Sequence, residues 1–88
     1  MQNVYQTRDL CLATTLLTLK FSLIGLDIQI EGVHQYPIGY FKFEESPDLL
    51  LAEQKYMNRE LAVEPISFAM NMKSLKAQVV SATKKPQK

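Results

Sequence analysis

The chain has 88 residues, of which 47% are hydrophobic and 22% charged, and its ten basic and nine acidic side chains give a formal net charge of +1. This composition is too apolar for an intrinsically disordered chain, and the balanced charge excludes a global field that would attract nucleic acid or an anionic membrane. We expect a single small domain over residues 1–81. Three lysines in the last five residues predict a disordered, lysine-rich tail over residues 82–88.

The first predicted elements are a short edge strand or extended lead-in near residues 4–6 and a helix over residues 8–20. Thr7 is the expected N-cap, and Asp9 in the first turn suits the positive end of the helix dipole. The apolar stripe of this helix consists of Leu12, Ala13, Leu16, Leu17 and Leu19. The threonines at positions 14, 15 and 18 fall on the other face, and the largely apolar helix is expected to be buried over a wide arc.

The apolar run Leu10–Leu19 is also the one candidate for a targeting segment. It is too short to span a bilayer, Asp9 and Lys20 flank it, and no small-x-small cleavage site follows. We therefore interpret it as a core helix, and Cys11 within it as a buried small hydrophobic residue. Because Cys11 is the only cysteine, no intrachain disulfide is possible, which favours a reducing, cytoplasmic setting.

Alternation of apolar and polar side chains predicts a β-hairpin with strands at about residues 21–31 and 38–44. In the first strand the apolar residues are Ile24, Leu26, Ile28 and Ile30, which alternate with Gly25, Asp27, Gln29 and Glu31. In the second strand Phe41 and Phe43 alternate with Tyr40, Lys42 and Glu44. We expect Phe41 and Phe43 on the core face, Gly25 at a bulge, and residues 32–37 in the loop.

Pairing like with like predicts the register of the hairpin. In this register Glu31 lies opposite Ile38. The pairs on the core face are then Ile28–Phe41 and Leu26–Phe43, and the pairs on the outer face are Gln29–Tyr40 and Asp27–Lys42. A slip by one residue would mix the two faces, so only even slips compete.

A second helix is predicted over residues 47–57. Ser46-Pro47-Asp48 combines a capping hydroxyl, a proline at the first helical position and an acid in the first turn. Asn58 is the expected left-handed stop. The residues expected to face inward are Leu49, Leu50, Ala52, Tyr56 and Met57.

A third helix is predicted over residues 65–81, beginning at Pro65. Its apolar seam consists of Phe68, Met72, Leu75 and Val79, with Lys73 and Lys76 on the wet side. Residues 61–63, ahead of this proline, are expected to be extended and are a candidate edge strand.

These elements predict an α+β fold, with a small antiparallel sheet whose apolar face is covered by three helices. A sheet of so few strands has edges on both sides, and free edges invite pairing across a symmetry axis. The sequence therefore also predicts a homodimer.

The opening of the chain resembles a known family. Val4-Tyr5-Gln6-Thr7-Arg8-Asp9-Leu10, followed by Leu12-Ala13, is similar to the start of short uncharacterised proteins from bacteria and their phages, catalogued as a domain of unknown function. Later similarities are Tyr40-Phe41-Lys42-Phe43-Glu44, Tyr56, Asn58, Glu60-Leu61-Ala62-Val63, Pro65, Phe68 and Leu75-Lys76. The chain departs from the family at Gln35-Tyr36-Pro37, where a tight polar turn is expected. Because the family has no assigned activity, the resemblance implies no catalytic residues.

The sequence offers little for catalysis. His34 is the only histidine, and with one cysteine it cannot supply the three or four nitrogen or sulfur ligands of a zinc site. Glu44, Glu45 and Asp48 are explained by a strand end and a helix N-terminus, where acids complement the dipole. The glycines are isolated, and no phosphate loop or nucleophile motif is present. We expect a non-enzymatic protein without catalytic, cofactor, metal or small-molecule sites.

The leading hypothesis is therefore a protein-binding module. Tyr36, Tyr40 and Lys42 form its candidate interaction surface on the wet face of the sheet, since tyrosine is enriched at interfaces. The methionines at positions 57, 70 and 72 are interpreted as core fillers.

The alternative is a nucleic-acid-associated regulatory module. The strand Gly39-Tyr40-Phe41-Lys42-Phe43 resembles the aromatic strand on which RNA-recognition sheets stack bases. However, alternation turns both phenylalanines inward, and acidic neighbours surround Tyr40, which disfavours a polyanion. Arg8, Lys20 and the tail lysines are the residues left to contact a nucleic-acid backbone.

Overall fold

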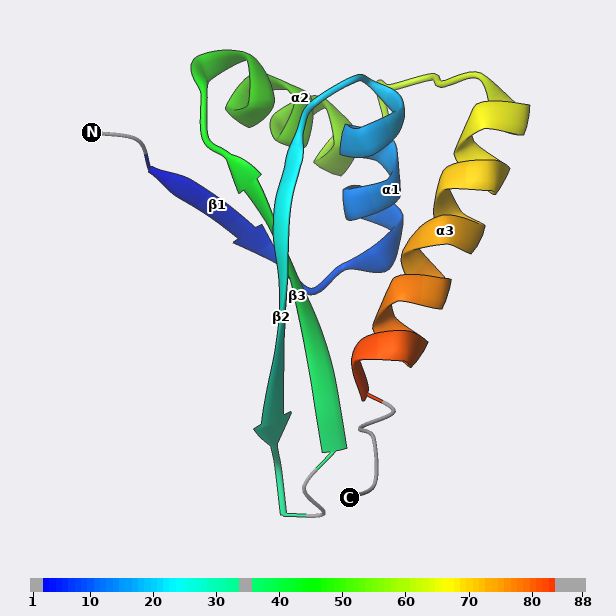
Figure 1. The fold of residues 1–88 in the computed structure, drawn as a ribbon. Coiled ribbons are helices and arrows are strands. Elements are labelled where there is room, and N and C mark those ends of the chain that lie inside the picture. The colour runs from blue at the N-terminus through cyan, green and yellow to red at the C-terminus, as the bar shows by residue number, and fades with distance from the viewer. Residues whose placement is uncertain (1–2, 34–35, 84–88) are drawn as a thin grey trace.

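The computed structural model describes residues 3–33 and 36–83, apart from the side chains of Tyr36 and Thr83. In chain order its elements are β1 (Val4–Thr7), α1 (Leu10–Thr18), β2 (Leu23–Glu31), β3 (Tyr36–Glu44), α2 (Pro47–Met57) and α3 (Pro65–Thr83) (Figure 1). The predicted α+β class and the predicted strand near residues 4–6 are confirmed. The last helix continues through Ala82 and Thr83, two residues beyond the predicted end. His34 and residues 84–88 lie outside the described residues.

Within the described part of the chain, the sheet has three strands in the order β1-β3-β2, and both pairs are antiparallel. The strand rich in phenylalanine, β3, is therefore central. The candidate strand at residues 61–63 is wrong, because these residues are in irregular structure between α2 and α3. Leu61 and Val63 line a cleft together with Thr15 of α1, so this segment lies over a helix and does not reach the sheet.

The hairpin pairs two residues away from the predicted register. Leu26 lies opposite Phe41 and Ile28 opposite Gly39, whereas the predicted partners of these two residues were Phe43 and Phe41. The partner of Phe43 is Leu23, because a bulge between Leu23 and Gly25 shifts the pairing by one residue there. Because the slip is even, Leu26, Ile28, Ile30 and the residues of β3 keep their predicted faces, and the bulge expected near Gly25 is confirmed. The prediction that Ile24 lies on the core face is wrong, because the bulge brings Leu23 opposite Phe43 and leaves Ile24 52% exposed.

The loop is shorter than predicted, which explains this slip. Glu31 lies opposite Tyr36, so β3 begins at Tyr36 and residues 32–35 connect the strands. Gly32 has a φ of 83°, a left-handed conformation that glycine adopts without a steric penalty. The second strand of the hairpin therefore begins two residues earlier in the chain than expected.

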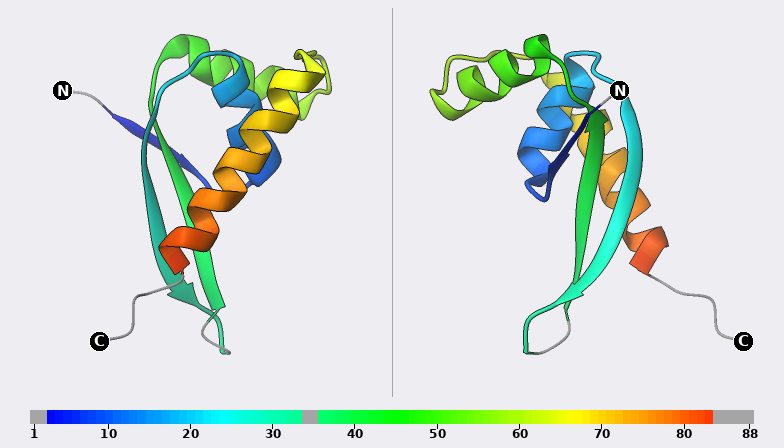
Figure 2. Two further views of the ribbon diagram at one scale, coloured as in Figure 1. Left: turned by 45° about the vertical axis from the view of Figure 1, so that its right-hand side comes forward. Right: turned by 90° about the vertical axis from the view of Figure 1, so that its left-hand side faces the viewer.

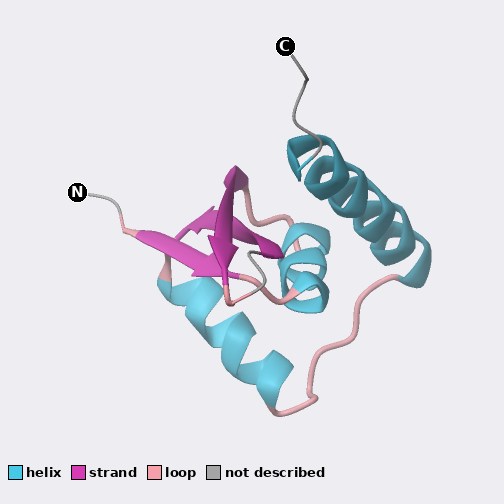
Figure 3. Cartoon of the chain, turned by 90° about the horizontal axis from the view of Figure 1, so that it is seen from below, coloured by secondary structure: helices cyan, strands magenta, loops and turns pink. Residues whose placement is uncertain are grey.

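The core lies between the sheet and the helices. Its buried members are Leu12, Ala13, Leu16, Phe41, Phe43, Leu49, Ala52 and Leu75. The end-on view shows α1 between α2 and α3, close to the sheet (Figure 3). The prediction that Phe41 and Phe43 point inward is confirmed, since they are 2% and 0% exposed. The helix layer therefore covers the face of the sheet that carries the two rings.

Helix α1 begins two residues later than predicted. Asp9, and not Thr7, is its N-cap, because the Asp9 Oδ1 accepts a hydrogen bond of 3.2 Å from the Leu12 N–H. The Thr7 hydroxyl instead accepts from the Asp9 N–H at 3.1 Å. The helix ends at Thr18, and Lys20 turns the chain with a left-handed φ of 79°.

The buried arc of α1 is wide, as expected. It also includes two threonines that were predicted to lie on the opposite face of the helix. Thr14 and Thr15 are buried, and their hydroxyls donate to the backbone carbonyls of Leu10 and Cys11 at 2.7 and 2.8 Å. The prediction that Cys11 is buried is wrong, because its side chain is exposed. Cys11 is the second residue of α1 and precedes the buried run Leu12–Leu16.

Helix α2 starts where its cap predicts, with the Ser46 hydroxyl accepting from the Leu49 N–H at 3.1 Å. Leu49 and Ala52 are buried, but Leu50 and Met57, predicted to face inward, are 41% and 62% exposed. The helix meets the core along one narrow side, so only one stripe of it is covered.

The connection to α3 differs from the prediction at one residue. The left-handed residue after α2 is Arg59, with a φ of 61°, and Asn58 has an ordinary φ of −86°. In α3 the predicted seam is confirmed: Leu75 is fully buried, and Phe68, Met72 and Val79 are half-buried, with Lys73 and Lys76 exposed. Met70, predicted as a core filler, is 66% exposed, on the opposite side of the helix from this seam.

Candidate functional site

The candidate site is the face of the sheet turned away from the helices, which we call the outer sheet face. Alternation along β3 places Ile38, Tyr40 and Lys42 on it, because Phe41 and Phe43 occupy the core face. The register sets Asp27 beside Tyr40 and Gln29 beside Ile38. Lys42 has cross-strand neighbours in both other strands, whereas Ile38 and Tyr40 are paired with β2 alone.

Tyr40 lies near the centre of this face. Its hydroxyl donates a hydrogen bond of 2.6 Å to Glu31 Oε2, and Arg8 Nη1 lies 3.7 Å from Glu31 Oε1. Arg8 follows the end of β1 and Glu31 ends β2, so this network joins all three strands. The hydrogen bond to Glu31 is the main cause that raises the pKa of Tyr40 above its usual value, because it stabilises the protonated phenol.

Lys42 lies beside Tyr40 on the same face. Its cross-strand neighbours are Gly25 and Gln6, and its ammonium group pairs diagonally with Asp27 at 3.7 Å. The predicted association of Asp27 with Lys42 is present, although the two residues are not directly opposite. Both side chains are partly exposed, so the ion pair contributes little to stability and remains available to exchange partners.

Two of the three residues predicted for the interaction surface are therefore brought together, Tyr40 and Lys42. The backbone of Tyr36 lies opposite Glu31 at the start of β3, but its side chain is outside the described part of the structure. Sequence reasoning missed Arg8 as a member of this surface. Its position follows from the pairing of β1 with β3, which sets the preceding residue, Thr7, opposite Phe41.

The charges on the outer sheet face are mixed. Among the described residues, Arg8 and Lys42 are its cations and each is paired with a carboxylate, and Glu44 adds a further negative charge at the end of β3. A polyanion would have to displace Glu31 and Asp27 from these cations and would meet their repulsion. The face therefore suits a partner with its own mixed charges.

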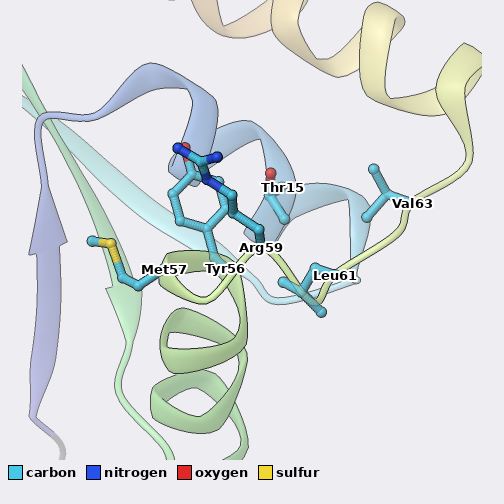
Figure 4. Close-up of a pocket in the computed structure, with 6 residues that line it drawn as sticks. All are labelled: Thr15, Tyr56, Met57, Arg59, Leu61 and Val63. Atoms are coloured by element: carbon cyan, nitrogen blue, oxygen red, sulfur yellow. The ribbon is translucent and has the colours of Figure 1, made fainter.

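A cleft on the helical side is a second place where a ligand could lie. It has a volume of about 450 Å³ between α1 and the segment that joins α2 to α3, and Figure 4 shows its walls. Its lining residues are Thr15, Tyr56, Met57, Arg59, Leu61 and Val63. The Arg59 side chain lies beside the Tyr56 ring (Figure 4).

The chemistry of this cleft is limited. The Thr15 hydroxyl is already bonded to a backbone carbonyl, and the Tyr56 hydroxyl donates a long bond of 3.4 Å to Asp9. Burial raises the pKa of Tyr56 above its usual value, so this phenol is a weaker acid than an exposed tyrosine. No lining residue is a carboxylate, histidine or cysteine, so the cleft lacks an acid–base pair. In the described residues, no group of three histidine, cysteine, aspartate or glutamate side chains could hold a metal ion.

Two other polar contacts have structural roles. Tyr5 joins β1 to α2, since its hydroxyl donates a 2.7 Å bond to Glu53, and burial together with this bond raises the Tyr5 pKa well above its usual value. The Glu64 carboxylate accepts from the N–H groups of Ile66 and Ser67 at the start of α3. A hydrogen bond from the Ser67 side chain contributes most to lowering the pKa of Glu64. The N-terminus of α3 is thus occupied by the chain's own carboxylate.

Comparison with protein-family models, with curated proteins and with solved structures finds no match to this chain. The resemblance to short bacterial and phage proteins stays a prediction. No helix in the described ranges combines the length and apolar character needed to cross a membrane.

Proposed function

We propose that this protein is a non-enzymatic binding module that acts through protein contacts on its outer sheet face. The helices pack on the other side of the sheet (Figure 1), and among the described residues none covers the outer face. There, a half-buried tyrosine is held between strands by Glu31 and Arg8. Held in this way, the Tyr40 ring loses little conformational entropy on binding, and such rings often dominate protein interfaces.

A protein partner is favoured over nucleic acid by the charge of the face. Among the described residues of the outer sheet face, the cations Arg8 and Lys42 are paired with carboxylates, and the carboxylate without an ion pair is Glu44. Tyr40 is the single described aromatic side chain on the face. Single-strand binding surfaces need a positive groove and several stacking rings. Among the described residues this face meets neither requirement, which supports a protein partner over the nucleic-acid alternative.

The setting of this function is also part of the proposal. The single cysteine, exposed on α1, is compatible with a reducing, cytoplasmic environment, where free thiols persist. The resemblance at residues 4–13 points to a bacterial or phage protein. Self-association through a sheet edge belongs to the same class of function and is taken up below.

The test is capture of partners by the immobilised full chain, with and without nuclease treatment. Tyr40→Ala is expected to abolish capture, and Lys76→Glu, an exposed change on the helical side, is expected to leave it intact. Tyr40→Phe keeps the aromatic ring but removes the hydroxyl that donates to Glu31, so it tests the contribution of the ring separately from that of this hydrogen bond. Capture that nuclease removes would instead support the nucleic-acid alternative, and capture that Tyr40→Ala leaves unchanged would exclude the outer sheet face.

A further inference from the structure

The edge of β2 is the longest backbone surface that the sheet leaves open. In the described structure β2 is the terminal strand and pairs with β3 on one side (Figure 2, right). It has nine residues, Leu23–Glu31, whereas β1 at the other edge has four, Val4–Thr7. The N–H and C=O groups along a free edge can pair with another strand.

β2 has a bulge and two acidic residues, Asp27 and Glu31, but it lacks other features that protect an edge. It contains neither proline nor lysine, and its bulge at Ile24 leaves Gly25–Glu31 regular. On the core face near the hairpin tip, Ile30 is 56% exposed. A strand with these properties is suited to pair with a second strand of matching pattern.

We infer that a second copy of this chain pairs with β2, antiparallel to it, with Ile28 opposite Ile28 of the second copy. This symmetric register places Leu26 opposite Ile30 on the core face, so aliphatic side chains meet only aliphatic ones. On the outer face it places Asp27 opposite Gln29, a carboxylate beside an amide. No two like charges lie directly opposite each other in Gly25–Glu31.

The competing symmetric registers are less favourable. Centring the pair on Asp27 brings the two Asp27 carboxylates together, and centring it on Gln29 brings Asp27 opposite Glu31 twice. Centring it on Leu26 runs the pairing into the bulge at Ile24. A slip by one residue would join the apolar face of one copy to the polar face of the other. Centring it on Ile30 leaves only Gln29–Glu31 of the strand paired. Charge, face matching and the length of the pairing together therefore favour Ile28 as the centre.

The pairing has a consequence for the outer sheet face. Two copies would form one continuous six-stranded sheet, with the Tyr40 sites of both on the same side and the Asp27–Gln29 pairs between them. The dimer would thereby present two equivalent sites to a partner. This inference goes beyond the partner binding proposed above and does not depend on it.

Sedimentation equilibrium of the full chain over a micromolar concentration series tests the proposal, against the monomer mass of 10.1 kDa. The wild type is expected to dimerise. Gln29→Glu creates two symmetric like-charge pairs with Asp27 and is expected to weaken the dimer about two- to thirty-fold at low salt. Gln29→Lys creates two opposite-charge pairs and is expected to tighten it.

Gln6→Glu and Gln6→Lys are the matched controls, because Gln6 is an exposed glutamine on the same face at the opposite edge of the sheet. They are expected to leave the dimer unchanged, and circular dichroism verifies that each variant is folded. A wild-type chain that stays monomeric overturns the inference. So does a dimer that responds to the Gln6 variants but not to those at Gln29. A wild-type chain that dimerises but captures no partner would count only against the outer-face proposal.

Discussion

The two halves of the β2–β3 hairpin share one alternating pattern but differ in burial. In the half near the helices, the inward-facing Phe41 and Phe43 are 2% and 0% exposed. In the half near the hairpin tip, the inward-facing Ile28 is half-buried and Ile30 is 56% exposed. Alternation therefore decides which way a side chain points, but the elements packed above it decide how much water it loses.

The difference follows from the lengths of the neighbouring elements. The last pair between β1 and β3 is Thr7–Phe41, so β1 flanks only the half of β3 near the helices. Helix α1 has nine residues, and only α3 extends toward the tip (Figure 2, left). There the Val79 side chain approaches Gly39 and the half-buried Ile28. We expect this distal half to contribute less to stability than the proximal half.

The largest expected effect is that of Phe43→Ala. Phe43 is fully buried at the centre of the core, and truncating a buried phenylalanine costs about 3–5 kcal/mol through lost transfer energy and a residual cavity. Urea unfolding followed by circular dichroism measures the change in the free energy of unfolding. A loss below about 1 kcal/mol would contradict the placement of this ring, since such values are typical of surface changes.

An intermediate effect is expected from Gly39→Val. A Cβ at Gly39 would lie 3.4 Å from both Leu26 Cδ1 and Val79 Cγ2, so the added methyl groups force α3 away from the sheet. Overpacking of this kind costs about 1–3 kcal/mol in the free energy of unfolding. The control is Gly25→Val, whose Cβ would meet only the flexible Lys42 stem at 3.9 Å. Equal losses for the two variants in thermal or urea unfolding would show that α3 does not pack closely over Gly39.

The smallest effect is expected from Ile30→Ser. Because Ile30 is more than half exposed at the distal end, the free energy of unfolding should change by no more than about 0.5 kcal/mol. The measurement is made at a concentration where the chain is monomeric, since the proposed dimer would bury this side chain. A loss comparable to that of Phe43→Ala would mean that the distal half belongs to the same core.

Several features of the fold were predictable because they depend on residues close together in the chain. Ser46 and Pro47 mark the start of α2 whatever packs against it, and Pro65 marks the start of α3. The faces of Phe41 and Tyr40 follow from the twofold period of any strand. Tyr40 and Lys42 were predictable as members of the candidate site for this reason.

Other features depended on contacts between distant segments. The Tyr40–Glu31–Arg8 network depends on the pairing of β1 with β3, and no local sequence pattern predicts this pairing. Cys11 was predicted to be buried because it lies in an apolar run, yet the buried part of α1 begins only at the next residue, Leu12.

The amino-acid sequence by itself determined the α+β class, the starts of α2 and α3 and the faces of most hairpin residues, since each is set by side-chain periodicity or by local capping and proline residues. The tertiary structure alone decided the central place of β3, the two-residue change of register caused by the short loop, and the long open edge of β2. These depend on which distant segments reach one another, and that is settled by the lengths of the elements and the space they leave in the core.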